Sequence, residues 1–151
     1  MKKIFLVLLV LVACFGLTGC GEKNIEGSLE DIMVKVYEGI PDEEKPMMLM
    51  NVEVTEENVE GFLGTDKVEY VEALASESGV GSIAHSVVLV RTKEGADVEA
   101  IKKTIKDNVN PRKWVCVEAE NVYVESKGDL IILIMSNDLA DDIKTNFENL
   151  K

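Results

Sequence analysis

The motif that points most specifically to a chemical modification lies near the start of the chain, at Leu17-Thr18-Gly19-Cys20. They close an apolar run over residues 4–17, which follows Lys2 and Lys3. The run has the length of a signal-peptide core and is shorter than the roughly 20 apolar residues that a spanning helix needs. The sequence therefore predicts an exported chain whose signal segment ends at a cysteine.

Leu17-Thr18-Gly19-Cys20 is similar to the lipobox of bacterial lipoprotein precursors. By that resemblance the sulfur of Cys20 receives diacylglycerol, the chain is cleaved before Cys20, and residues 1–19 are a lipoprotein signal peptide. The alternatives are an uncleaved membrane anchor and an ordinary secretory signal with an incidental cysteine. Each buried methylene of an acyl chain contributes about 0.8 kcal/mol, and two or more chains make attachment stable. The resemblance implies a chain anchored by lipid on the outer face of the bacterial cell membrane.

The other candidates for chemistry lack partners in the sequence. His85 is the only histidine, and no nucleophile motif accompanies it, which favours a structural histidine. Met47, Met48 and Met50 raise the idea of a copper(I) site, because thioether sulfur suits that ion. Methionine clusters more commonly fill hydrophobic cores, and no cysteine or histidine lies beside these. We therefore expect no catalytic residues, no metal and no cofactor.

Arg112, Lys113 and Trp114 form the candidate interaction patch of the sequence. They concentrate positive charge and the only tryptophan in an acidic chain, and Trp and Arg are over-represented where partners bind. The favoured alternative is structural: Pro111 ends the preceding helix, Trp114 enters the core, and both cations lie where the helix dipole favours positive charge.

Charge and cysteine content limit the partners of the mature chain. All 28 acidic residues follow Cys20, whereas two of the 16 basic residues are Lys2 and Lys3, so the mature net charge is −14. Such a surface is repelled by nucleic acid and by anionic headgroups, so we expect no nucleic-acid partner and attachment through lipid alone. Cys116 is the one cysteine left beside Cys20. Its apolar surroundings indicate a small buried hydrophobe.

The elements that must position these residues form a single domain over residues 28–151, after a polar tether at residues 20–27. At roughly 3.3 Å per residue, this tether reaches about 25 Å at most. Periodicity predicts a helix over residues 28–40, capped by Ser28, an extended segment over 47–54, and a short helix capped by Thr55.

The remainder divides into two units with the order strand, strand, helix. The expected strands are residues 68–76, 83–92, 122–126 and 130–135. The expected helices are residues 97–109, capped by Asp97, and residues 138–150. Residues 87–90 and 130–135 are continuously apolar, which indicates strands covered on both faces. We expect the two later helices on one face and the two earlier helices on the other. This predicts an α+β fold with a mostly antiparallel sheet of about four or five strands and helices packed on it.

Several stretches resemble a domain-of-unknown-function family of small bacterial lipoproteins, found mainly in Gram-positive anaerobes. They are Leu29-Glu30-Asp31-Ile32-Met33, Ile83-Ala84-His85-Ser86-Val87-Val88-Leu89-Val90, Asn110-Pro111-Arg112-Lys113-Trp114 and Gly128-Asp129-Leu130. The likeness extends over nearly the whole mature chain. It implies the lipid anchor and carries over no activity, cofactor or catalytic residue.

The anchor, the short tether and the lack of a catalytic constellation predict a non-catalytic binding or interaction domain. We expect it to act at the membrane on an envelope protein or a wall component. The alternative is a lipoprotein that binds a small solute or ion and delivers it to a membrane partner. A closed core would favour the first function, and a polar-lined cavity would favour the second.

Overall fold

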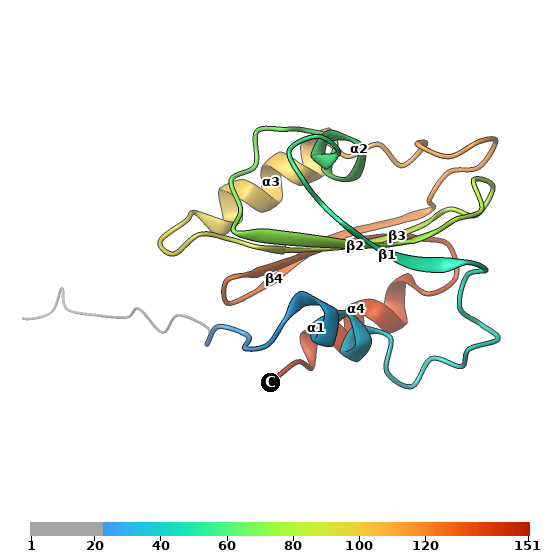
Figure 1. Ribbon diagram of the computed structural model, residues 1–151, viewed down its shortest axis with the longest axis horizontal. Helices are drawn as coiled ribbons and strands as arrows, with labels where there is room; N and C mark the ends of the chain where they lie inside the picture. Colours follow the sequence, from blue (N-terminus) through green and yellow to red (C-terminus); the bar gives the residue numbers. More distant parts are fainter. Residues whose placement is uncertain (1–22) are drawn as a thin grey trace, which may run out of the picture.

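The computed structural model describes residues 23–151, so the signal segment and Cys20 lie outside the described residues. Five strands form one antiparallel sheet between layers of helices (Figure 1). The strands are β1 Leu49–Glu53, β2 Glu72–Ser78, β3 His85–Arg91, β4 Asn121–Lys127 and β5 Leu130–Ser136, in the spatial order β1-β2-β3-β5-β4. The helices are α1 Leu29–Val36, α2 Val59–Leu63, α3 Val98–Asn108 and α4 Ala140–Glu148. The α+β fold and the two strand-strand-helix units are confirmed.

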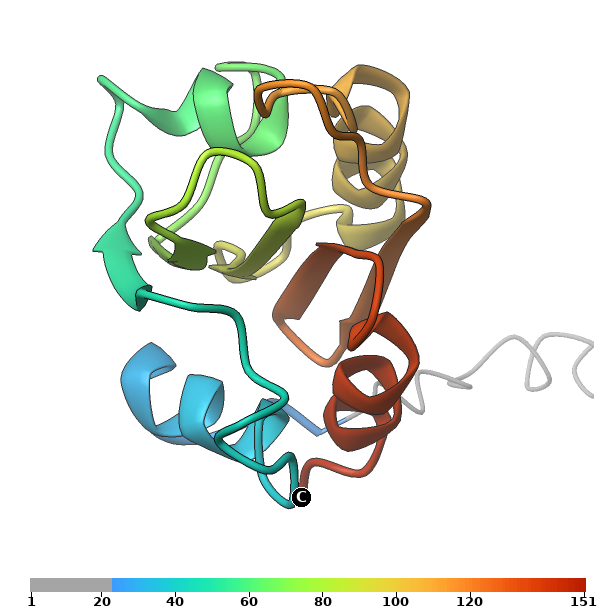
Figure 2. The same cartoon turned by 90° about the vertical axis from the view of Figure 1, so that its right-hand side faces the viewer.

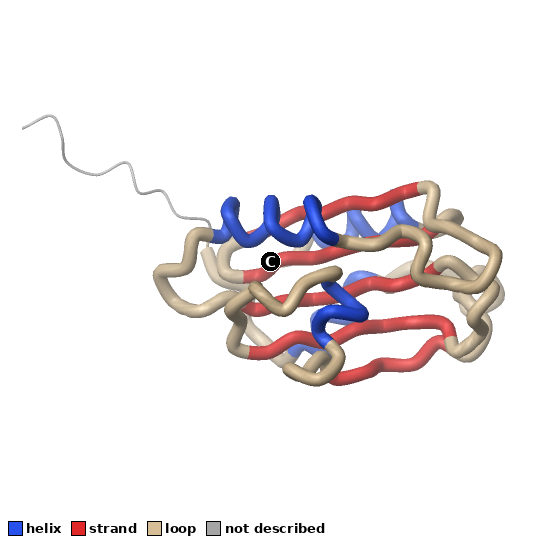
Figure 3. Tube along the Cα trace, turned by 90° about the horizontal axis from the view of Figure 1, so that it is seen from above, coloured by secondary structure: helices blue, strands red, loops and turns tan. Residues whose placement is uncertain are grey.

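The strands with continuously apolar sequences, β3 and β5, are neighbours inside the sheet, and β1 and β4 form its edges. Figure 3 shows the strands lying side by side in one sheet. Leu89 of β3 pairs with Ile132 of β5, and both residues are 0 % exposed. Every residue of β5 is buried. The expectation that both faces of these strands are covered is confirmed.

The helices cover the two faces in a different combination from the one expected. α1 packs with α4 on one face, and α2 lies with α3 on the other (Figure 2). The prediction that α3 and α4 share one face is wrong. The strand order gives the reason: α3 crosses β5 on one face on the way to edge strand β4, so α4, which follows β5, covers the other face.

Side-chain caps set the starts of α1 and α3 as predicted. Ser28 Oγ accepts a hydrogen bond from the Asp31 N–H at 3.1 Å, and Asp97 Oδ1 accepts one from the Ala100 N–H at 3.0 Å. Each bond satisfies a backbone donor that the helix leaves unpaired. α1 ends at Val36, before the predicted end at residue 40.

α2 begins at Val59 and is not capped by Thr55 as expected. The Asn58 side chain instead accepts from the Thr55 N–H at 2.8 Å and donates to the Glu53 carbonyl at 3.0 Å. These bonds hold residues 53–58 in a turn between β1 and α2.

The tether is shorter than predicted, because the chain packs on the domain before residue 28. Ile25 is 3 % exposed and belongs to the core on the α1 and α4 side. Arg91, at the end of β3, donates to the carbonyl oxygens of Ile25 and Gly27 at 2.9 and 2.8 Å. Gly128, in the β4–β5 turn, lies against Lys23 and Asn24. Within residues 23–151, none of the helices combines the length and the apolar character that crossing a membrane requires.

Candidate functional site

His85, the first residue of β3, is buried and hydrogen-bonded on both sides of its ring. Nε2 lies 2.6 Å from the Tyr37 hydroxyl, and Nδ1 lies 3.0 Å from Ser136 Oγ. Burial, opposed by the negative charge of Asp138, lowers the pKa of His85 to about 4, and burial raises the pKa of Tyr37. The network joins the end of α1 to the sheet. His85 and Ser136 are 1 % and 3 % exposed, so a reactant has no access to either side chain.

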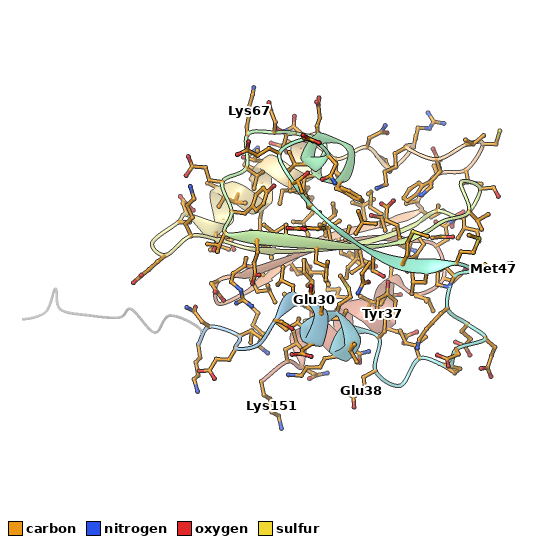
Figure 4. The ribbon with its side chains drawn as sticks, viewed as in Figure 1. Glu30, Tyr37, Glu38, Met47, Lys67 and Lys151 are labelled. Atoms are coloured by element: carbon orange, nitrogen blue, oxygen red, sulfur yellow. The ribbon has the colours of Figure 1, made fainter. Side chains whose placement is uncertain are left out.

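The three methionines lie on the surface, and the expectation that they fill the core was wrong. Met47, Met48 and Met50 are 70 %, 63 % and 46 % exposed. They lie at the start of edge strand β1, and Figure 4 labels Met47 there. Among the described residues, no group of three or more histidine, cysteine or acidic side chains is placed to hold a metal ion.

The structure separates the three residues of the candidate patch. Arg112 is exposed and pairs with Glu118 at 2.6 Å. Lys113 points inward, where its ammonium pairs with Glu77 of β2, and the two side chains are only 17 % and 21 % exposed. Trp114 is half-buried against the core on the α2 and α3 side. The two cations therefore do not form one basic surface.

Cys116 is exposed, which contradicts its assignment as a buried hydrophobe. The loop that carries it runs beside the β2–β3 turn, where the Val115 N–H donates to the Gly81 carbonyl at 2.9 Å. Cys116 has a left-handed φ of 64°, and the loop leaves both its thiol and the Val115 side chain outside the core. The apolar sequence of this segment misled the prediction because the segment forms no strand.

A cavity of about 640 Å³ opens beside Lys113 and Trp114. Its lining comes from the loop at residues 113–114, from α2 and the turn before it, and from β2: Glu57, Asn58, Glu60, Gly61, Phe62, Glu77, Lys113 and Trp114. With three carboxylates and one ammonium, this Trp114 cavity is acidic. Sequence reasoning missed its α2 side, because nothing in the sequence brings residues 57–62 to residues 113–114.

A larger hollow of about 730 Å³ lies on the opposite face, between α1 and β1. We call it the α1–β1 groove. Its lining is Met33, Val34, Lys35, Tyr37, Glu38, Gly39, Ile40, Lys45, Leu49, Asn51 and Ser76. The exposed side chains of Glu38 and Asn51 give it polar groups among apolar walls, whereas the Tyr37 hydroxyl is bonded to His85 and Ser76 is 1 % exposed. Tyr37 and Glu38 mark its α1 side in Figure 4.

The strand that borders this groove has an open edge. β1 pairs with β2 alone among the described strands. The Val54 N–H donates to the Ala73 carbonyl of β2, and the Met48 carbonyl accepts from the N–H of Gly79, the residue after β2. Because hydrogen-bonded residues alternate along an antiparallel pair, the N–H and C=O groups of Leu49 and Asn51 point away from β2. The same two residues line the groove with their side chains.

No family model matches the chain, and no curated protein and no solved structure matches it. The resemblance to a lipoprotein family therefore stays a prediction from the sequence.

Proposed function

We propose that the protein is a lipid-anchored, non-catalytic interaction domain that binds an extended polypeptide segment of an envelope protein along the open edge of β1. One observation carries this proposal. Leu49 and Asn51 direct their backbone groups to an open edge and their side chains into the α1–β1 groove. An added strand would satisfy these backbone groups and direct alternate side chains into the groove.

The spacing of the backbone groups of β1 favours an extended polypeptide as the ligand of this edge. Outward N–H and C=O groups recur at every second residue of a strand, and another strand presents matching groups at the same spacing. β1 has five residues, and the Asn58 side chain already occupies the carbonyl of Glu53. The edge therefore suits a short segment, because only Leu49 and Asn51 have both an outward N–H and an outward C=O open to a partner.

The lining of the groove supports a particular kind of side chain. Apolar walls from Met33, Ile40 and Leu49 favour an aliphatic or aromatic body, and the exposed amide of Asn51 favours a polar tip. In strand addition, backbone bonds supply affinity and the side-chain pocket supplies selectivity. We therefore propose that a residue such as tyrosine enters the groove.

The anchor limits where the partner lies. Lipidation of Cys20 is our proposal from the lipobox, and residues 24–27 pack on the domain. At roughly 3.3 Å per residue, the four steps from Cys20 to Asn24 reach about 13 Å. This short link favours a partner that is itself at the membrane surface.

Substitution of Asn51 tests the proposal. Asn51→Pro removes an outward N–H and places a ring at the edge without removing a bond to β2. Asn51→Ala is the control, because it keeps the backbone intact. After the intact lipoprotein has been cross-linked in membranes and its partner segment identified, we expect Asn51→Pro to weaken binding of that segment at least tenfold and Asn51→Ala to weaken it less.

Hydrogen exchange supplies the second measurement. The amides of Leu49 and Asn51 should exchange rapidly in the free protein and slowly in the complex. Full binding by a folded Asn51→Pro variant, or protection that leaves these two amides unchanged, contradicts strand addition.

Binding of a small solute is the second candidate function, and the polar groups in the groove favour it. A solute held by the side chains of Glu38 and Lys45 would not use the backbone edge. Glu38→Gln combined with Lys45→Gln would then abolish binding, whereas Asn51→Pro would have little effect. Native mass spectrometry of the lipoprotein from membranes would detect such a solute directly.

A further inference from the structure

We propose that the Trp114 cavity is a second binding site, which takes a cationic group, either an ammonium or a guanidinium. The cavity lies on the face covered by α2 and α3, opposite the α1–β1 groove. Its residue Glu77 stands on β2, directly opposite Met50 of β1. This site is independent of the strand addition proposed above, because the two use different faces of the sheet.

Lys113 indicates which chemistry the walls of the cavity accept. Its Nζ lies 4.9 Å from the centre of the Phe62 ring and 5.4 Å from that of the Trp114 ring. Both distances fall within the roughly 6 Å at which a cation is attracted to an aromatic face. The same ammonium pairs with Glu77 and lies 3.3 Å from Ser86 Oγ. The cavity thus already holds one ammonium between two rings and a carboxylate.

One ammonium does not neutralise the cavity. Glu77 forms an ion pair with Lys113. Glu57 and Glu60 form no ion pair with any residue in 23–151. Both of these glutamates are exposed at the opening. Their two negative charges remain available to a cation that enters from outside, and an anionic or neutral ligand would gain nothing from them.

Trp114 supplies the aromatic surface for the second cation. The residue is half-buried and lines both this cavity and a neighbouring one of about 470 Å³. Part of its surface is therefore open to a ligand as well as to Lys113. Tryptophan gives the strongest cation–π attraction of the aromatic side chains. As the only tryptophan of the chain, it also reports on this cavity by fluorescence.

Titration of the Trp114 emission in the full-length lipoprotein, held in detergent, tests the site. The probes are trilysine, spermidine and magnesium chloride at matched ionic strength. We expect a saturable change in emission with at least one organic cation and none with Mg²⁺, which is strongly hydrated and binds poorly to aromatic faces. A response to trilysine alone identifies a polypeptide side chain as the source, and a response to spermidine alone identifies a free amine.

Two double variants separate the site from general charge. Glu57→Gln with Glu60→Gln removes the two free carboxylates, and we expect at least tenfold weaker binding of the responding probe. Glu30→Gln with Glu43→Gln removes the same charge at exposed positions outside the cavity (Figure 4 labels Glu30 on α1) and should leave binding unchanged. The proposal is overturned if no organic cation gives a saturable change, if Mg²⁺ gives the same change, or if both variants bind equally.

Discussion

The Tyr37–His85–Ser136 network shows how a single residue acquires a structural role from partners far away in the chain. Both ring nitrogens of His85 have a hydroxyl partner, so the buried ring leaves no polar atom unsatisfied. No second histidine and no nucleophile motif accompanies His85 in the sequence, and this pattern indicated the structural histidine that is observed. The partners themselves could not be predicted, because they lie 48 and 51 residues away and are brought together by the strand register.

The His85 network predicts that stability falls in mild acid. The pKa of His85 in the folded protein is about 4, below the ordinary 6.5, so the unfolded chain takes up the proton first as the pH falls. The contribution of the neutral ring is complete above about pH 6.5 and is lost as the pH falls toward 4. Between about pH 7 and pH 5 the loss should be about 2 kcal/mol.

Chemical denaturation of wild type and His85→Gln over this range measures the effect. The variant should be less stable at neutral pH but should show a smaller dependence on pH, because Gln does not titrate. Carboxylates contribute equally to both proteins and cancel in the difference. Parallel pH profiles for the two proteins would show that the His85 ring does not resist protonation.

The two cations of the candidate patch should differ in their effect on stability. Arg112 is exposed, and its pair with Glu118 should contribute little, so Arg112→Ala should change the free energy of unfolding by less than about 0.5 kcal/mol. Lys113→Ala leaves the partly buried Glu77 without its partner and should cost about 1–3 kcal/mol. Thermal and denaturant unfolding of each variant provides the comparison. Equal losses would contradict the inward position of Lys113.

At the scale of the elements, the central strands and the capped helices followed from local patterns. The apolar runs of β3 and β5, and the caps of α1 and α3, act within a few residues and were predicted correctly. The pairing of helices across the sheet was not predictable in this way, because it depends on the order of the strands. β2 starts at Glu72, later than predicted, since residues 68–70 belong to no strand.

Gly64 lies where the end of α2 contacts the end of α3, and we expect its substitution to have a strong effect on stability. It ends α2 in the left-handed region with a φ of 75°, and a Cβ there would lie 2.1 Å from the carbonyl oxygen of Asn108 at the end of α3. Gly64→Ala therefore adds a steric clash to the left-handed backbone penalty of about 1–2 kcal/mol. We expect a loss of about 3 kcal/mol or more, at the upper end of single substitutions.

Gly61→Ala is the matched control within the same helix. A Cβ at Gly61 meets no atom within 4 Å, so alanine should be neutral or should stabilise α2 by up to about 1 kcal/mol. Denaturant unfolding of both variants measures the difference. Similar stabilities would mean that the ends of α2 and α3 separate without cost.

At the scale of the whole molecule, the described chain starts beside the β4–β5 turn, and the exposed methionines lie at the other end of the sheet (Figure 4). If Cys20 carries the lipid, the β4–β5 turn faces the membrane. Met47, Met48 and Met50 then lie at the distal end. The sequence could predict the anchor motif, but this orientation depends on how residues 24–27 pack, which their polar composition does not reveal.

Cys20→Ser tests the anchor. The wild-type N-terminal peptide should carry acyl chains on Cys20, detectable by mass spectrometry. The variant should lack them and should be either released or retained as uncleaved precursor, since two or more acyl chains are what make attachment stable. An unmodified Cys20 in the wild-type membrane fraction would rule out the lipoprotein assignment.

If Cys20 carries the lipid, Arg91 determines how closely the domain is held to it. Its guanidinium donates to the carbonyl oxygens of Ile25 and Gly27 and pairs with Glu72 and Asp129 at 2.8 and 3.1 Å. Arg91→Gln removes the guanidinium that makes these hydrogen bonds, so residues 24–27 should detach from the domain. Amide exchange in this segment should become at least tenfold faster. The link from Cys20 to residue 28 would lengthen to about 26 Å at roughly 3.3 Å per residue.

Lys93→Gln is the control for Arg91→Gln, because it removes a positive charge just beyond β3 that pairs only with the exposed Glu69. Hydrogen exchange of the peptide covering residues 23–29 distinguishes the two variants, and we expect only Arg91→Gln to accelerate it. Denaturant unfolding should show that the rest of the domain remains folded, since the detached residues leave β3 and β5 paired. Unchanged exchange in Arg91→Gln would mean that burial of Ile25 alone fastens the segment. The orientation toward the membrane would then depend on that one side chain, and Ile25→Ala should release it.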